Sequence, residues 1–233
     1  MRMGDSMRRM FVIVGAPLIF SALLHASEAA QFENGDEEGT ARVSLSELAV
    51  KADLVAVAQV KDTDYVYARS FPNEGSAFLR TLIIYKNKQP VEDIIEVYEK
   101  GLHPYECYFE NPTVFEEGRR YLVFFRLDPE DSQRYRGLAA GCALEIFVTQ
   151  SNGYALKYPV DGMCLSDELA GLVNRFDFHD NYALVEEESL SPAQRDDLLA
   201  NNLIISYQNK FKFTHGVDLT AVRKLIPAEV LRE

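Results

Sequence analysis

The sequence predicts an α+β fold, in which a five-stranded antiparallel β-barrel is preceded by a short helix and followed by a β-hairpin and a helical C-terminal region. Two observations predict it. From about residue 54 to residue 158, apolar residues alternate or form short runs that are separated by turn residues, as in antiparallel strands. From Ser166 onward, the apolar period changes to about 3.6 residues, which is typical of amphipathic helices.

A short helix is predicted at the start of the folded part of the chain. Ser44 and Glu47, three residues later, form a capping box, in which each side chain binds the backbone N–H of the other residue. Leu45 and Leu48 then supply the apolar side of a helix that ends near Ala52.

Five strands are predicted after this helix. The first begins with the apolar run at Leu54 and alternates as far as Tyr67, and the turn over residues 72–75 joins it to a second strand. These two strands are expected to form a long antiparallel hairpin. The second to fifth strands are expected over residues 78–85, 93–99, 121–125 and 138–149, and a turn at 151–153 leads into a further strand over 154–158.

Helices are predicted in the last third of the chain, over residues 166–176, 191–207 and 218–226. The second has the clearest start, because Ser191 and Gln194 form a capping box around Pro192 at the first helical position. Pro227 stops the third helix.

Residues 1–29 are predicted to be a secretory signal peptide. A cluster of arginines precedes the apolar run Phe11–Leu24, which is too short to span a bilayer comfortably. Small residues then favour cleavage after Ala29 or Ala30. The processed protein is therefore expected to be periplasmic or secreted, with no stable membrane span.

The rest of the chain is divided by composition into three parts. Residues 30–42 are polar and are expected to form a flexible leader. Residues 43–162 contain the barrel with its hairpin extension, and residues 163–233 contain the helical region. The net charge of −12 disfavours nucleic acid as a partner, because an acidic chain repels phosphate groups.

Three cysteines, Cys107, Cys142 and Cys164, follow the signal peptide, and in an oxidising compartment two of them are expected to pair. Three pairings are possible, and the residue numbers alone do not choose among them.

Several motifs between residues 52 and 142 point to one family. They are Ala52-Asp53 before the first strand, Leu82–Lys86, Cys107, Phe115–Phe124 with its Gly-Arg-Arg-Tyr-Leu-Val-Phe sequence, and Gly141-Cys142. Five strands with such turns suit a closed barrel of the oligonucleotide/oligosaccharide-binding (OB) type. The segment resembles the netrin-like barrel domain of the tissue inhibitor of metalloproteinases superfamily, particularly its bacterial members.

This resemblance implies a disulfide between Cys107 and Cys142 and a binding or inhibitory role in place of catalysis. The animal inhibitors of the superfamily chelate the protease zinc with a cysteine at the mature N-terminus. The processed chain begins near Ala30 or Gln31, so this inhibitory mechanism is not expected here.

The expected function is that of an exported, non-enzymatic protein-interaction module, with an unknown protein or extended ligand as partner and no cofactor or metal. The candidate binding surface is aromatic and consists of Tyr65, Tyr67, Phe71, Tyr105 and Tyr108. One alternative is an oligosaccharide-binding module that uses the same tyrosines. A second is an envelope enzyme that uses Cys164 with a histidine, for which the candidates are His103, His179 and His215.

Overall fold

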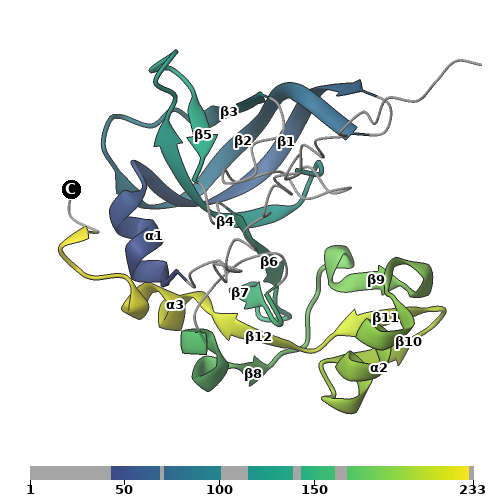
Figure 1. The fold of residues 1–233 in the computed structure, drawn as a ribbon. Helices are drawn as coiled ribbons and strands as arrows, with labels where there is room; N and C mark the ends of the chain where they lie inside the picture. The colour runs from purple at the N-terminus through teal and green to yellow at the C-terminus, as the bar shows by residue number, and fades with distance from the viewer. Residues whose placement is uncertain (1–42, 69–70, 101–114, 139–142, 161–166, 231–233) are drawn as a thin grey trace, which may run out of the picture. The chain divides into compact units, whose positions relative to one another are not determined.

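The computed structural model describes residues 43–68, 71–100, 115–138, 143–160 and 167–230 (Figure 1). These residues form an α+β fold with a closed five-stranded barrel, a short helix before it, additional strands and a C-terminal helix, which confirms the predicted fold class. The strands are β1 (Leu54–Ala68), β2 (Phe71–Asn87), β3 (Ile94–Lys100), β4 (Arg120–Leu127), β5 (Tyr135–Gly137), β6 (Ala143–Val148), β7 (Tyr154–Lys157), β8 (Asn174–Arg175), β9 (Leu184–Glu186), β10 (Ile204–Tyr207), β11 (Lys210–Phe213) and β12 (His215–Asp218). The helices are α1 (Leu45–Lys51), α2 (Pro192–Ala200) and α3 (Leu219–Leu225), with 3₁₀ helices η1 (Asp167–Leu172), η2 (Asn181–Ala183) and η3 (Glu187–Ser189).

The barrel closes in the order β1, β2, β3, β5, β4 and back to β1. The β3–β5 pair is parallel, with Val97 opposite Tyr135, so the barrel is mixed whereas the sequence predicts an antiparallel one. The strand predicted over residues 138–149 is β6, whereas the short strand β5, which closes the barrel, precedes that range and was not predicted. β5 and β6 both pair with β4, opposite Phe125–Leu127 and Arg120–Val123 respectively, and β6 continues the sheet through β7 and β12 to β8.

The barrel interior is one of three hydrophobic cores. Along β1, Leu54, Ala56 and Ala58 belong to this core, whereas Val55 and Val57 between them belong to a second core on the other face of the strand. All five are fully buried, so β1 is covered on both faces. The other buried residues of the barrel interior are Val60, Ala77, Leu79, Ile95, Val97, Phe115, Tyr121, Val123, Phe125 and Tyr135.

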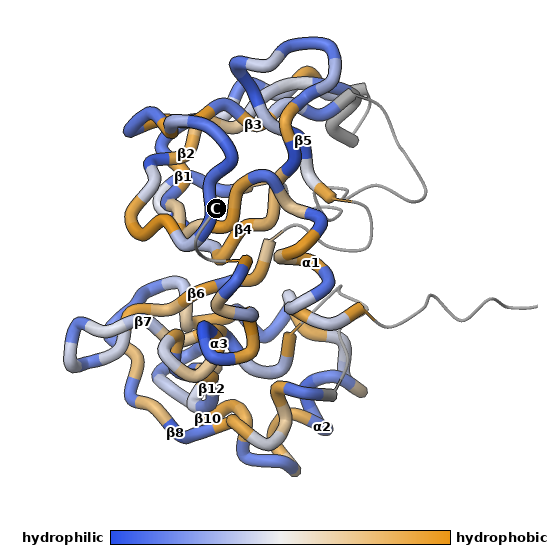
Figure 2. Tube along the Cα trace, turned by 90° about the vertical axis from the view of Figure 1, so that its left-hand side faces the viewer, coloured by the Kyte–Doolittle hydropathy of each residue, from blue (hydrophilic) through white to orange (hydrophobic). Residues whose placement is uncertain are grey.

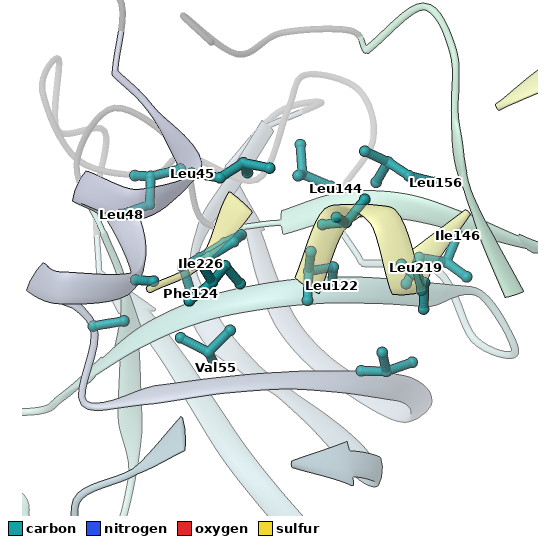
Figure 3. Close-up of a cluster of buried hydrophobic side chains, with 14 of the residues drawn as sticks. Leu45, Leu48, Val55, Leu122, Phe124, Leu144, Ile146, Leu156, Leu219 and Ile226 are labelled. Carbon is teal, nitrogen blue, oxygen red and sulfur yellow. The ribbon is translucent and has the colours of Figure 1, made fainter. Parts of the chain in front are cut away.

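Helix α1 packs on the outer face of the barrel. Its predicted capping box is present, since the Ser44 hydroxyl accepts the Glu47 N–H (3.1 Å) and the Glu47 carboxylate accepts the Ser44 N–H (2.8 Å). Leu45 and Leu48 point into the second core together with Phe124 of β4 (Figure 3). Strands β6 and β7 and helix α3 complete this core with apolar side chains of their own.

The C-terminal region differs from the predicted helical region, because it contains strands β8 to β12 as well as helices. The helix expected over residues 166–176 is the 3₁₀ helix η1, which ends at Leu172 and is followed by β8. Helix α3 follows its N-cap Asp218 and ends before Pro227, as predicted.

Helix α2 ends earlier than the sequence predicts, at Ala200 instead of Tyr207. Asn202 has a left-handed φ of 56°, and the Leu203 N–H donates to the Leu198 carbonyl (2.9 Å). This is the Schellman arrangement that terminates helices. The apolar residues beyond it therefore belong to β10, which pairs with β11.

Strands β9, β10 and β11 form a second, three-stranded sheet. A third core lies among this sheet, α2 and β6–β7. Its buried residues are Phe147, Ala155, Phe178, Ala183, Leu198, Ile204 and Phe213.

The C-terminal region also holds the turn that precedes β4. The Tyr182 hydroxyl donates to the Glu117 carbonyl (2.7 Å), and Asp180 pairs with Arg120 (3.4 Å). Gly118 has a φ of 83°, and a Cβ there would lie 2.2 Å from the Tyr182 hydroxyl oxygen. Glycine suits this turn, because its left-handed backbone conformation strains any other residue, and a side chain here would also displace the Tyr182 hydroxyl.

Candidate functional site

The first two barrel strands form a long hairpin. β1 pairs with β4 only as far as Gln59, whereas its pairing with β2 continues to Ala68, which lies opposite Phe71. β3 pairs with the same part of β2, over Glu74–Arg80. Within the described residues, Asp62, Asp64 and Val66 of β1 therefore pair with no strand on the side away from β2.

One face of this part of the sheet points away from the barrel interior. Ala77, Leu79 and Val97 belong to the interior core, so the residues that alternate with them point outward. The strand register aligns three rows on this outward face: Asp62, Phe78 and Glu96; Asp64, Ser76 and Tyr98; Val66 and Glu74. We call these residues the outer hairpin face, which lies on β1, β2 and β3 of Figure 1.

The outer hairpin face is acidic. Four of its eight residues, Asp62, Asp64, Glu74 and Glu96, are carboxylates. Asp62 and Asp64 are exposed and lie on the strand with the unpaired edge. The Glu96 carboxylate accepts a hydrogen bond from the Ser76 hydroxyl (2.5 Å), which fixes its position in the middle of the sheet. The residues of this face therefore carry an excess of negative charge.

Apolar groups lie among these carboxylates. Val66 is 56% exposed and lies directly opposite Glu74, while Phe78 is half-buried between Asp62 and Glu96. An exposed aliphatic side chain next to carboxylates suits a partner that carries both apolar and basic groups.

Tyr98 in the middle row is covered on one side. The Arg134 guanidinium carbon lies 3.9 Å from the centroid of the Tyr98 ring, and that of Arg136 lies 5.5 Å away. Both arginines are held by Asp128, through pairs of 2.6 Å and 3.0 Å. Asp128, Arg134 and Arg136 thus hold the Tyr98 ring in place on this face.

The predicted aromatic surface is only partly assembled at this hairpin. Tyr67 is 54% exposed, but Tyr65 packs against the barrel interior, where burial raises the pKa of its hydroxyl above the ordinary value. Phe71 is placed opposite Ala68 at the end of the hairpin. Tyr105 and Tyr108 lie outside the described residues. Tyr67 thus remains available for binding, whereas the ring of Tyr65 contributes to the core.

Gly75 allows the two strands of the hairpin to approach closely. It has a φ of 144°, and a Cβ at this position would lie 2.1 Å from the Asp64 carbonyl oxygen and 2.6 Å from the Tyr65 Cα. The glycine therefore keeps Asp64 and its neighbours in register with β2.

The residues of the predicted disulfide, Cys107 and Cys142, lie outside the described residues, as does Cys164. The two histidines that the structure describes have local roles. The backbone N–H of the exposed His179 donates to the Val148 carbonyl (2.9 Å), and the His215 Nδ1 lies 2.8 Å from the Thr214 hydroxyl.

The described part of the chain contains no group of three His, Cys, Asp or Glu residues that could hold a metal ion. No helix in that part is long and apolar enough to cross a membrane. No family model matches the chain, and no curated protein or solved structure matches it either.

Proposed function

We propose that this chain is an exported, non-enzymatic protein-interaction module with a netrin-like barrel, and that it binds an extended, basic segment of a partner protein along the outer hairpin face. The observation that carries the proposal is the row of carboxylates beside an unpaired strand edge: Asp62 and Asp64 are exposed on the part of β1 that lacks a second strand partner among the described residues.

The binding mode follows from the geometry of an edge strand. An extended peptide can add through backbone hydrogen bonds to the side of β1 that has no strand partner among the described residues, and its side chains then alternate between the two faces of the sheet. Every second side chain would lie beside Asp62, Asp64 or Val66. A partner with lysine or arginine at alternate positions, followed by an apolar residue, therefore matches this edge.

Export and the family resemblance are part of the same proposal. The arginine-rich N-terminus and the apolar run Phe11–Leu24 support a signal peptide. The closed barrel with a helix before it supports the netrin-like reading. A cleaved signal would place the acidic face outside the cytoplasm, where it could meet partners of the cell envelope.

The aromatic residues favour a protein partner over an oligosaccharide. Sugar-binding sites use open aromatic faces, but Tyr65 packs against the barrel core and Arg134 covers one side of Tyr98. Exposed carboxylates at strand spacing suit a basic peptide better, because they offer charge complementarity as well as a backbone edge.

Binding of a synthetic peptide tests this proposal. We expect a peptide of alternating lysine and threonine to bind the processed protein, and a matched peptide of alternating glutamate and threonine not to bind. Replacing Asp62→Asn and Asp64→Asn together should weaken binding by roughly tenfold, since two exposed ion pairs contribute up to about 2 kcal/mol. Fluorescence anisotropy at low and high salt measures both effects, and salt should weaken the binding of the lysine peptide.

A matched control is the double replacement Glu187→Gln and Glu188→Gln, which removes two exposed acids of η3 and leaves the hairpin unchanged. This variant should bind the lysine peptide like the wild type. Equal loss of binding in the two double variants would mean that only net charge matters, and the proposed site would be wrong.

A further inference from the structure

A second strand edge lies at the other end of β2, far along the strand from the outer hairpin face. The Thr81 N–H donates to the Asp93 carbonyl (3.0 Å), and pairing with β3 ends there. β2 nevertheless continues to Asn87, paired with β1. Within the described residues, the other side of Leu82–Asn87 has no strand partner, and we call these residues the β2 edge segment.

The β2 edge segment is unusually apolar for an exposed strand. Leu82, Ile83 and Ile84 follow one another and are 36%, 38% and 43% exposed. A regular strand would turn alternate side chains to opposite faces. Here the register shifts between Val57 and Ala58, so Leu82 is an extra residue in β2 and the alternation is interrupted. This hydrophobic run can be followed along β2 in Figure 2.

Two neighbouring apolar residues enlarge this surface. Ile94 at the start of β3 is 42% exposed and lies opposite Arg80. Val50 near the end of α1 is 59% exposed, and its carbonyl accepts a hydrogen bond from the buried Lys86 of the edge segment (3.3 Å). Lys86 thus holds the end of α1 beside the edge.

The two ends of the β2 edge segment carry opposite net charge. The end at Thr81 carries Arg80, Glu92 and Asp93, which together have one negative charge in excess. At the other end, Lys86 lies in the segment itself and Lys88 pairs with Asp53 (3.1 Å). The Arg223 guanidinium carbon lies 5.9 Å from the Tyr85 ring centroid, and Asp218 is also near Tyr85, so this end has positive charge in excess. An edge with this pattern is complementary to itself when a second copy runs antiparallel to it.

We propose that the β2 edge segment pairs with the same segment of a second copy of this chain, forming a two-fold symmetric dimer. A two-fold axis requires the same surface on both copies and antiparallel strands. With Ile84 against Ile84, Lys88 of one copy lies beside Arg80, Glu92 and Asp93 of the other. The pairing satisfies the backbone groups of both edges and removes the apolar run from water.

This dimer leaves the outer hairpin face open on both copies, because that face and the β2 edge segment occupy opposite ends of β2. The inference is therefore independent of the proposed function. A dimer would carry two peptide-binding faces, and either proposal can fail without the other.

Sedimentation equilibrium tests the inference. The sample is the full chain purified from the cells that express it, after any processing that occurs there. We expect a dimer for the wild type and a monomer for Ile84→Lys, which places an ammonium group at the centre of the interface. The matched control is Ile205→Lys, since Ile205 of β10 is similarly exposed at 39% and lies outside the interface. This control should remain a dimer. A monomeric wild type, or equal dissociation of the two variants, would overturn the proposal.

Charge exchange provides a second test that does not change an apolar residue. Lys88→Glu alone should weaken the dimer by roughly tenfold, because it places like charges together across the interface. Adding Glu92→Lys to it should restore the dimer, because the opposite charges then face each other again. Failure of the second replacement to restore association would rule out the antiparallel register, and circular dichroism confirms that each variant is folded.

Discussion

Replacing Asp128 by alanine is expected to lower the free energy of unfolding by about 3–5 kcal/mol, the range found when one partner of a buried ion pair is removed. The Asp128 side chain is completely buried and accepts hydrogen bonds from the Glu130 N–H (2.9 Å) and from the Arg134 Nε (2.6 Å). It also pairs with the Arg136 Nε (3.0 Å). Without the carboxylate, two arginines lose their shared partner in a poorly hydrated site.

Urea denaturation followed by circular dichroism measures this loss. Asp196→Ala serves as the control, because Asp196 is exposed and pairs only with its neighbour Arg195 among the described contacts, so its removal should leave the denaturation midpoint unchanged. If Asp128→Ala unfolded at the same urea concentration as the wild type, the charged cluster would have no stabilising role.

The same carboxylate makes stability depend on pH. Burial opposes ionisation of Asp128, but the hydrogen bonds from Glu130, Arg134 and Arg136 outweigh it and hold the pKa below the ordinary value of aspartate. The ionised form is therefore favoured by folding. Its contribution is complete above the pKa of the unfolded chain, about 3.9, and is lost as the pH falls through the lower pKa of the folded state. Asp128→Ala should lack this part of the acid dependence.

Phe125→Ala is expected to have a similarly large effect, a loss of about 3–5 kcal/mol in the free energy of unfolding. Phe125 is fully buried in the barrel interior, where its ring contacts Phe115 edge-on at a centroid distance of 6.3 Å and Tyr135 at 6.5 Å. Truncation leaves a cavity at the point where β4 pairs with both β1 and β5.

Phe125→Leu is the matched control for this change, because leucine keeps most of the buried volume and should cost clearly less. Thermal unfolding of the three proteins gives the comparison. Equal midpoints for the alanine variant and the wild type would show that the barrel interior is not the stabilising core described above.

Local sequence signals predicted the helix starts correctly. Ser44 with Glu47 and Ser191 with Gln194 form the expected capping boxes, because a cap depends only on residues within one turn of the helix. The end of α2 was missed because apolar residues recur at helical spacing beyond Ala200. Asn202, which can adopt a left-handed conformation, was the available signal for it.

The candidate site could be predicted only in part. The alternation of Asp62, Asp64 and Val66 is visible in the sequence, but Glu74 and Glu96 join them only through the register of β1, β2 and β3. Register depends on turn geometry and on bulges that shift the pairing, and these are not encoded in a local pattern.

Bulges also explain why the exposure of the aromatic residues and of the β2 edge segment was not predicted from the sequence. The register shift between Val66 and Tyr67 accompanies the exposure of both side chains, although regular alternation would place them on opposite faces. A sequence pattern with a period of two cannot show where such a shift occurs.

Site-specific photocrosslinking tests the central claim most directly. A photoreactive amino acid at Val66, on the outer hairpin face, should give a covalent adduct with a partner protein in the cell envelope, and the crosslinked peptide of the partner should be extended and basic. The same amino acid at Ile205 should not give this adduct. An identical adduct from both positions, or a crosslinked segment without basic residues, would contradict the claim that the acidic hairpin face is the binding site.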